Sequence, residues 1–291
     1  MSVVARVRTY GSLVAFVHTV FAMPFAASAV VLSLAVPHEP LTALRIVAMV
    51  VCMVCARTSA MAFNRWADRD VDAKNPRTRT RHLPAGSVQA REALALAVVS
   101  ALAFLALAPT LGFWPAVLAP GVLAVLLGYS YAKRFTWGAH VWLGVALSLA
   151  PGGVWIAMGA RPGAGIVLLM AGVAAWLLGF DVLYSLQDED FDREEGLRSI
   201  PARFGKERAL TISAGAHVAT VAALAACGLA LGRGSLYALA VIVAAALLVY
   251  EHSLVRRKGL GAIDKAFFDV NAWVSVLFFV LVTIDELLRR R

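Results

Sequence analysis

Residues 43–72 read ALRIVAMVVCMVCARTSAMAFNRWADRDVD, an apolar run that ends in a cluster of charged side chains. The run is long enough to cross the hydrocarbon core of a bilayer, which takes about 20 residues of helix. Similar runs recur along the chain, and 60% of its 291 residues are hydrophobic while only 15% are charged. The sequence therefore predicts an all-α, polytopic membrane protein and not a soluble domain.

The apolar runs predict a bundle of about nine transmembrane helices. No linker, low-complexity tail or shift in composition marks a second domain, so residues 1–291 are expected to form a single transmembrane domain. The expected spans are residues 12–36, 43–64, 92–112, 114–132, 139–159, 164–187, 208–231, 235–252 and 266–288.

The net charge of +9 follows the expected membrane topology and does not indicate a nucleic-acid partner. Most of the 27 Lys and Arg residues fall in the N-terminus and in alternate loops, which the positive-inside rule places in the cytoplasm. We therefore expect a bacterial inner membrane protein with the loops at residues 65–91 and 188–207 on the cytoplasmic side. Arg289, Arg290 and Arg291 disagree, because nine spans would put them on the opposite side.

Two acidic clusters begin these two loops. In the first, Asn64, Asp68 and Asp72 are spaced by four residues, so on a helix their side chains share one face. In the second, Asp188 and Asp192 repeat the same spacing. Four expected spans separate the clusters, which places both on the same side of the membrane.

Carboxylates this close to one another repel, and the repulsion grows near a bilayer because the dielectric constant falls. A bound cation is therefore expected. Mg²⁺ suits the clusters better than zinc, because they offer oxygen ligands without Cys or His. Two acidic stripes on one side predict a bridged anion, for which diphosphate is the obvious candidate. Asp70, Glu189 and Asp190 lie off the stripes and are expected either to be solvated or to lie just behind the ligands.

Basic residues surround both clusters and offer donors for phosphate oxygens. Cytoplasmic loops are basic by default, so a purely topological role is the alternative for any one of them. Arg81 also lies near the first cluster but is not assigned to the diphosphate. The residues assigned to the diphosphate are Arg65, Lys74, Arg77, Lys133, Arg134, Arg198 and Arg203.

The two loops also resemble each other in sequence. Residues 81–85 read RHLPA after the first cluster, and residues 198–202 read RSIPA after the second. The match is short, but it points to an internal duplication in which two related halves present equivalent acidic sites.

At these residues the chain resembles the UbiA superfamily of intramembrane prenyltransferases, whose patterns are N-x-x-x-D-x-x-x-D and D-x-x-x-D. Further stretches resemble its 4-hydroxybenzoate polyprenyltransferase branch. They are HTVFAMPF at residues 18–25, NPRT at 75–78, YSYAKRF at 129–135 and IPARFG at 200–205.

The resemblance implies a helical bundle around a central cavity, closed toward the cytoplasm by the two acidic loops. It implies a Mg²⁺-dependent enzyme that moves a polyprenyl group from polyprenyl diphosphate to an aromatic acid in quinone biosynthesis. Asn64, Asp68 and Asp72 would hold one Mg²⁺, and Asp188 and Asp192 the other. The four aspartates would be the catalytic residues.

Arg57 lies within an apolar span, seven residues before Asn64. A charge at that depth normally has a partner or a function. We assign it to the carboxylate of the aromatic acceptor, with a structural ion pair as the alternative. Asp181 is expected either to pair with Arg57 or to orient the acceptor hydroxyl.

Three other interpretations stay open. The acceptor is 4-hydroxybenzoate or, as the IPARFG stretch suggests, a dihydroxynaphthoate of menaquinone synthesis by the futalosine route. An ion-coupled transporter also places carboxylates in helices, but near the bilayer midplane and not at helix ends. The third interpretation, a phosphatidyltransferase, is disfavoured, because such an enzyme would carry a D-G-x-x-A-R pattern that this sequence lacks.

Overall fold

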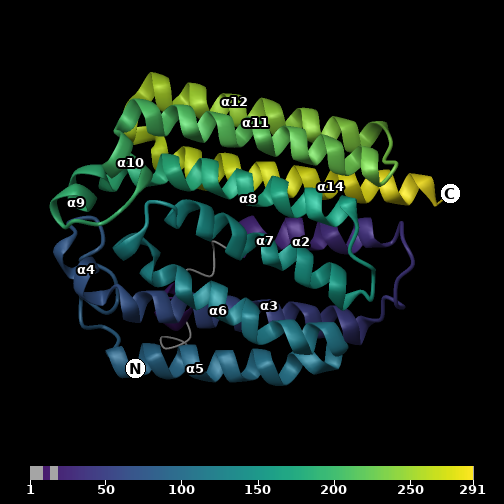
Figure 1. Cartoon of the computed structure of the whole chain (residues 1–291), viewed down its shortest axis with the longest axis horizontal. Helices are drawn as coiled ribbons and strands as arrows, with labels where there is room; N and C mark the ends of the chain where they lie inside the picture. The colour runs from purple at the N-terminus through teal and green to yellow at the C-terminus, as the bar shows by residue number, and fades with distance from the viewer. Residues whose placement is uncertain (1–8, 14–18, 291) are drawn as a thin grey trace. The chain divides into compact units, whose positions relative to one another are not determined.

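The computed structural model describes residues 9–13 and 19–290 of the chain. Every regular element in this part of the chain is a helix, which confirms the predicted all-α class (Figure 1). Eight of the described helices are long and apolar enough to cross a membrane, so the chain is an integral, multi-pass membrane protein. They are α3 (Ala43–Ala67), α5 (Ala90–Leu107) continued by the 3-10 turn η2 (Ala108–Leu111), α6 (Phe113–Phe135), α7 (Ala139–Ala157), α8 (Ala164–Ser185), α11 (Lys206–Ala230), α12 (Ser235–Lys258) and α14 (Asn271–Arg289).

These eight helices match eight of the nine predicted spans to within a few residues. The first predicted span, residues 12–36, corresponds to α2 (Thr19–Ser33), whose apolar stretch Met23–Ser33 is shorter than the others. Residues 14–18 of that span lie outside the described residues. Short helices connect the long ones on the polar loops: α4 (Arg69–Lys74), η3 (Leu186–Asp188), α9 (Glu189–Glu194), α10 (Ile200–Phe204), η4 (Gly259–Ala262), α13 (Ile263–Lys265) and the π-helical η5 (Ala266–Val270).

The chain divides into two compact units. Unit 1 comprises Met1–Thr19 and Leu41–Tyr131 and is built around α3 and α5. Small side chains let these two helices approach closely, with Ala62 and Ala97 buried between them. The ring of Phe63 contacts those of Trp66 and Tyr131, at centroid distances of 5.5 and 5.9 Å. These contacts fix the last turn of α3, where the first acidic motif begins.

Unit 2 comprises Val20–Pro40 and Ala132–Arg291. Its central helix, α8, packs against α7 and α11, while α12 packs against α14 and α11 (Figure 1). Gly144 of α7 lies so close to α8 that a Cβ atom there would be 2.4 Å from the carbonyl oxygen of Ala174. The aromatic rings of Phe25, Trp176 and Phe278 fill the core between α2, α8 and α14. Close packing of this kind holds α8, and with it the second acidic motif, in a fixed position.

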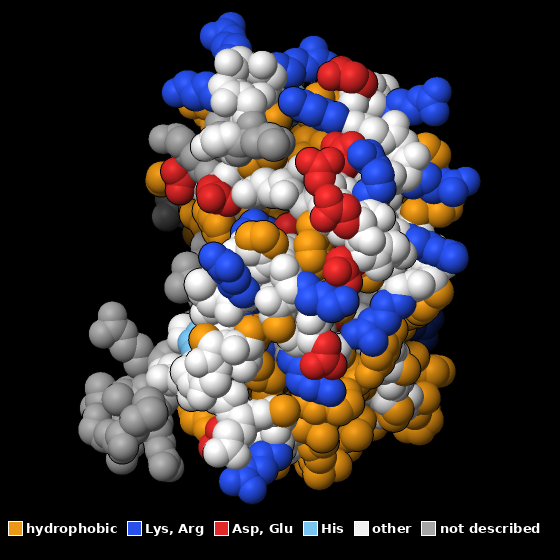
Figure 2. Space-filling view, turned by 90° about the vertical axis from the view of Figure 1, so that its left-hand side faces the viewer, with side chains coloured by type: hydrophobic (Ala, Val, Ile, Leu, Met, Phe, Trp, Pro, Cys, Tyr) orange, Lys and Arg blue, Asp and Glu red, His pale blue; other side chains and the backbone are white. Residues whose placement is uncertain are grey.

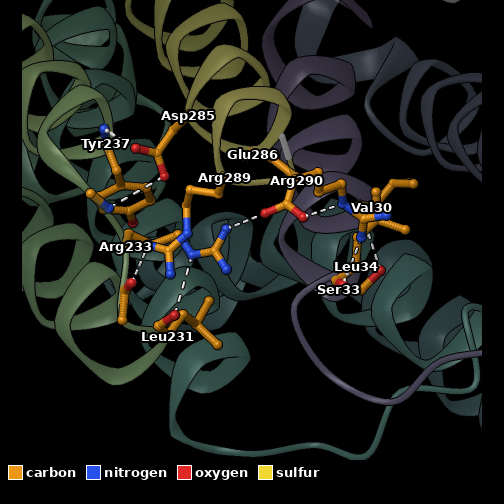
Figure 3. A network of polar contacts seen from close by, with 12 residues as sticks. Val30, Ser33, Leu34, Leu231, Arg233, Tyr237, Asp285, Glu286, Arg289 and Arg290 are labelled. Carbon is orange, nitrogen blue, oxygen red and sulfur yellow. Dashed lines mark hydrogen bonds and ion pairs between the residues drawn. The ribbon is translucent and has the colours of Figure 1, made fainter.

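A buried carboxylate, that of Glu286, connects the C-terminal end of α14 to neighbouring segments through hydrogen bonds (Figure 3). Glu286 accepts hydrogen bonds from Arg233 at 2.5 Å and from Arg290 at 2.6 Å. Arg290 also donates to the carbonyl oxygen of Leu34, just after α2, and Arg289 donates to that of Gly232. The C-terminal arginines that disagree with the charge rule therefore have a local role as ion-pair partners and donors to helix-end carbonyls. Arg291 lies outside the described residues.

Replacing this carboxylate should destabilise unit 2. In Glu286→Gln, Arg233, whose side chain is only 3% exposed, would keep its charge without a counterion. Breaking a buried ion pair in this way costs about 3–5 kcal/mol. We expect a clear fall in the midpoint temperature of unfolding in detergent, whereas Glu194→Gln, at an exposed position, should leave it unchanged. Equal midpoints for the two variants would contradict this role of Glu286.

Candidate active site

The first acidic motif spans the junction between α3 and α4. The N–H of Asp68 donates to the carbonyl of Asn64 at 2.9 Å, and the N–H of Asp72 donates to that of Asp68 at 2.7 Å. The four-residue helical spacing therefore continues through the junction, although the two helices are separate elements. As the sequence predicts, Asn64, Asp68 and Asp72 follow one face.

Asn64 is oriented by its neighbours on that face. Its side-chain nitrogen donates to Oδ2 of Asp68 at 2.8 Å and lies 3.5 Å from Oγ of Ser130 on α6. Since the amide nitrogen faces Asp68, the amide oxygen is the atom that can serve as a cation ligand. The sequence analysis did not predict a role for Ser130, because nothing in the sequence indicates that α6 approaches α3 at this point.

Asp72 has the clearest requirement for a further positive charge. Its carboxylate is 6% exposed, and Oδ1 forms an ion pair with Arg81 at 2.7 Å. Oδ2 is buried and has no hydrogen-bond partner in the described part of the chain. A buried carboxylate oxygen without a partner is costly, so this atom is where a bound cation fits the residues present.

The other basic residues of unit 1 lie around this motif in different settings. Arg65 is half-buried and donates through Nε to the carbonyl of Leu13 at 3.4 Å. Burial, together with the positive charge of Arg65, lowers the pKa of His82 below its ordinary value. Arg77 is half-buried and Lys74 is exposed.

The second acidic motif follows α8 and occupies η3 and α9. Asp188 is 7% exposed and Asp192 is 2% exposed. Lys133, from the last turn of α6, forms an ion pair with Oδ2 of Asp192 at 3.0 Å. The lysine that the sequence assigns to the diphosphate therefore already contacts a carboxylate of the acidic motif, from a segment more than 50 residues away.

Acidic residues off the stripes lie where the spacing predicts. Asp70 is 80% exposed and pairs with Arg69 at 3.3 Å. Glu189 and Asp190 both pair with Arg193, at 2.8 and 3.7 Å. Asp70 and Asp190 are exposed, Glu189 is half-buried, and Asp72 and Asp192 are buried.

The remaining arginines assigned to the diphosphate, Arg134, Arg198 and Arg203, are exposed. Arg198 donates from Nη1 to the carbonyl of Phe135 at 2.6 Å. Arg198 and Arg203 line an open pocket of about 480 Å³, whose lining includes neither Asp188 nor Asp192.

Asp181 on α8 is held by His140 on α7. Nδ1 of His140 lies 2.6 Å from Oδ2 of Asp181, and the backbone N–H of Ile200 donates to Nε2 at 3.3 Å. An amide N–H can only donate, so Nε2 is the acceptor and the ring proton is on Nδ1, directed at Asp181. The sequence analysis gave pairing with Arg57 as one of two roles for Asp181 and did not name His140 as a partner, because only the packing of α7 on α8 brings the two together.

Arg57 lies on α3, in unit 1, and is half-buried. Its Nε is buried and has no hydrogen-bond acceptor among the described residues. A guanidinium N–H that is buried in an apolar helix without an acceptor is a suitable donor for a bound carboxylate.

The donor set of both motifs fits a hard cation. Among the described residues, no group of three or more His, Cys, Asp or Glu side chains is arranged as a complete metal site. Mg²⁺ does not need one, because it commonly takes one or two carboxylates and completes its shell with water and substrate phosphates. The oxygen-only donors and the partnerless Oδ2 of Asp72 fit such a site.

Together, the membrane-spanning helices and the acidic motifs at their ends define an integral membrane protein with a site suited to a cation and an anionic substrate. The sequence model of the UbiA prenyltransferase family matches residues 20–280. The chain belongs to the UbiA prenyltransferase family.

Relatives and solved structures agree with this assignment. The chain is 31% identical over 236 residues to a protein of Aromatoleum aromaticum named 4-hydroxybenzoate octaprenyltransferase, covering 80% of this chain and 78% of the relative. It is 32% identical to the protein of that name from Methylococcus capsulatus, covering 81% of this chain and 80% of the relative. The apo structure of a UbiA homolog from Aeropyrum pernix K1 has a TM-score of 0.83 at 33% identity, covering 92% of this chain and 98% of that one. A UbiA homolog from Archaeoglobus fulgidus, bound to GPP and Mg²⁺, shares the fold with a TM-score of 0.71 at 20% identity, covering 94% and 99%.

A divalent cation should stabilise the fold through Asp72. Binding to the folded state at a Mg²⁺ concentration about 100 times Kd contributes about 2.7 kcal/mol. We expect Mg²⁺ to raise the midpoint temperature of the wild-type protein and of Asp70→Asn, which removes an exposed carboxylate. Asp72→Asn should show a much smaller rise, and an undiminished rise in this variant would exclude Asp72 from the cation site.

Proposed function

We propose that this chain transfers a polyprenyl group from polyprenyl diphosphate to an aromatic acid, with Mg²⁺ as the cofactor. The observation that carries the proposal is the burial of Asp72, Asp188 and Asp192 at the ends of membrane-spanning helices of a chain in this family. Buried carboxylates concentrated at a membrane surface are suited to hold Mg²⁺ and, through it, a diphosphate. Neither the fold nor the similar proteins favour a transporter.

Each unit contributes its own ligands in this proposal. Asn64, Asp68 and Asp72 of unit 1 would hold one Mg²⁺, and Asp188 and Asp192 of unit 2 the other. Bound there, Mg²⁺ would neutralise the negative charge that develops on the departing diphosphate. The basic residues assigned to the phosphate oxygens are Arg65, Lys74, Arg77, Lys133 and Arg134.

The chain's own side chains would govern the remaining chemistry. The allylic C–O bond to the diphosphate breaks, a ring carbon of the acceptor forms the new C–C bond, and the ring loses one proton. Apolar side chains of the spans exclude water from the electron-deficient prenyl carbon. Arg57 would bind the carboxylate of the aromatic acid. Asp181, held by the proton on Nδ1 of His140, would accept a hydrogen bond from the acceptor hydroxyl.

4-Hydroxybenzoate is the acceptor we propose, because the two relatives from Aromatoleum aromaticum and Methylococcus capsulatus carry it in their names. A second candidate is a dihydroxynaphthoate of menaquinone synthesis by the futalosine route. Residues 200–205, IPARFG, also resemble a subgroup of the family that is associated with this second acceptor. Both acceptors present a carboxylate to Arg57 and a ring hydroxyl to Asp181, so the same roles serve either.

We also propose that residues 1–291 act as one transmembrane domain. The family match runs through both compact units, from residue 20 to residue 280. The distribution of Lys and Arg supports an inner-membrane location with α4, α9 and α10 on the cytoplasmic side.

Loss of a carboxylate from either motif should abolish transfer without unfolding the protein. Asp68→Ala and Asp188→Ala remove ligands from unit 1 and unit 2, and each should lower turnover by at least about 100-fold, as expected for a lost electrostatic contact to the transition state. Asp70→Ala and Asp190→Ala, at exposed positions, are the matched controls. Membranes with each variant are incubated with polyprenyl diphosphate, Mg²⁺ and each acceptor in turn, and products are identified by mass. Near-full activity in Asp68→Ala or Asp188→Ala would remove that residue from the site.

Arg57→Gln should weaken binding of the acceptor more than binding of the diphosphate. Loss of a hydrogen bond to a charged group costs about 1.5–3 kcal/mol, or roughly 10- to 100-fold in KM for the aromatic acid. The KM for polyprenyl diphosphate should stay within about twofold. A variant with unchanged KM for the acid would leave Arg57 with a structural role only.

A further inference from the structure

Unit 2 carries a second charged site on its surface, separate from the buried carboxylates. The pocket of about 480 Å³ is lined by Trp137, before α7, and by Arg193, Arg198 and Arg203, with the small residues Gly196 and Ala202. We call it the arginine pocket. The space-filling view of the face that carries α9 and α10 shows Lys and Arg side chains interspersed with acidic ones (Figure 2).

Two of the three guanidinium groups have no carboxylate partner. Arg193 is balanced by Glu189 and Asp190. Arg198 and Arg203 form no ion pair with an acidic side chain in the described part of the chain. The arginine pocket is therefore positively charged, although the acidic motif of α9 is adjacent in sequence.

Both of these arginines are held in place without an ion pair. Arg198 donates its backbone N–H to the carbonyl of Lys133 at 2.7 Å and its Nη1 to that of Phe135 at 2.6 Å. The guanidinium of Arg203 lies over the ring of Phe204, 5.6 Å from its centre. That ring in turn contacts the ring of Trp137 edge-on at 5.5 Å. Guanidinium groups fixed in this way lose little entropy when they bind a phosphate.

The position of the pocket points to a lipid phosphate. Its residues lie on the segment joining α6 to α7 and on the segment between α8 and α11, each of which connects two helices long and apolar enough to cross a membrane. Trp137 is 46% exposed, and half-exposed Trp at a helix end is typical of the headgroup region of a bilayer. Basic pockets at this level are suited to the headgroups of anionic lipids.

We propose that the arginine pocket binds the phosphate of an anionic phospholipid headgroup, with Arg198 and Arg203 as its main donors. The bound phosphate would also restrain the acidic motif. The same segment donates from the N–H of Leu197 to the carbonyl of Asp192, and from that of Arg198 to the carbonyl of Lys133, each at 2.7 Å. Lys133 and Asp192 themselves form an ion pair. A phosphate bound in the arginine pocket would therefore restrain the positions of both residues.

Lipid binding by the purified full chain tests this proposal without any measurement of turnover. Native mass spectrometry after release from micelles containing dioleoyl phosphatidylglycerol or dioleoyl phosphatidylcholine gives the affinity for each lipid. The test variant is Arg198→Gln with Arg203→Gln. The matched control is Arg256→Gln with Arg257→Gln, which removes the same charge from exposed positions at the end of α12.

We expect the wild-type protein and the control to bind phosphatidylglycerol, and the test variant to bind it at least tenfold more weakly. Inorganic phosphate and pyrophosphate, added as competitors, distinguish a lipid from a free anion. Equal phosphatidylglycerol affinity in the two double variants would overturn the proposal. Displacement of the lipid by millimolar inorganic phosphate, or equal binding of phosphatidylcholine, would overturn the lipid assignment. If the double variant does not fold, Arg203→Gln, whose side chain contacts the ring of Phe204, is compared with Arg256→Gln alone.

Discussion

Asp72 and Asp192 are carboxylates buried at the ends of helices that cross a membrane, and the rest of the site depends on how their charge is balanced. Removing an ion of this kind from water costs several kcal/mol unless cations and hydrogen-bond donors compensate. The chain supplies only part of that compensation. Among the described residues, Asp72 pairs with Arg81 and Asp192 with Lys133, and Oδ2 of Asp72 has no hydrogen-bond partner there. Because the negative charge of these carboxylates is only partly neutralised, they can still bind Mg²⁺, which in turn can bind an anionic substrate.

The two motifs reach a similar balance by different routes. Their loops correspond in sequence, with Arg81 and Arg198 at matching positions, yet only Arg81 contacts the carboxylate of its own motif. In unit 2 the cation comes from Lys133 at the end of α6, and Arg198 is directed instead to the carbonyl of Phe135. Because Arg198 does not pair with the carboxylate of its own motif, its guanidinium can take the phosphate-binding role proposed for the arginine pocket. The same loop segment would then link lipid contact to the geometry of Asp192.

The sequence predicted what depends on local spacing and on hydrophobicity. The spans follow from the length of the apolar runs, and the shared face of Asn64, Asp68 and Asp72 follows from helical geometry, which continues across the break between α3 and α4. Features that depend on packing between distant segments were out of reach. The pairing of His140 with Asp181 and that of Lys133 with Asp192 each join residues about 40 or more positions apart. The hydrogen bonds of Arg289 and Arg290 to the carbonyls of Gly232 and Leu34 also join distant residues and were not predicted.

Cation stoichiometry tests the central claim most directly. Electron paramagnetic resonance can follow the binding of Mn²⁺, as a substitute for Mg²⁺, to the purified chain in the presence of an unreactive prenyl thiodiphosphate. The account predicts two bound Mn²⁺ per wild-type chain, each bound more tightly when the thiodiphosphate is present, and loss of one site in Asp72→Asn and of one in Asp192→Asn. An Mn²⁺ affinity that the thiodiphosphate does not change would contradict the account. So would the same number of bound Mn²⁺ ions in both variants as in the wild type.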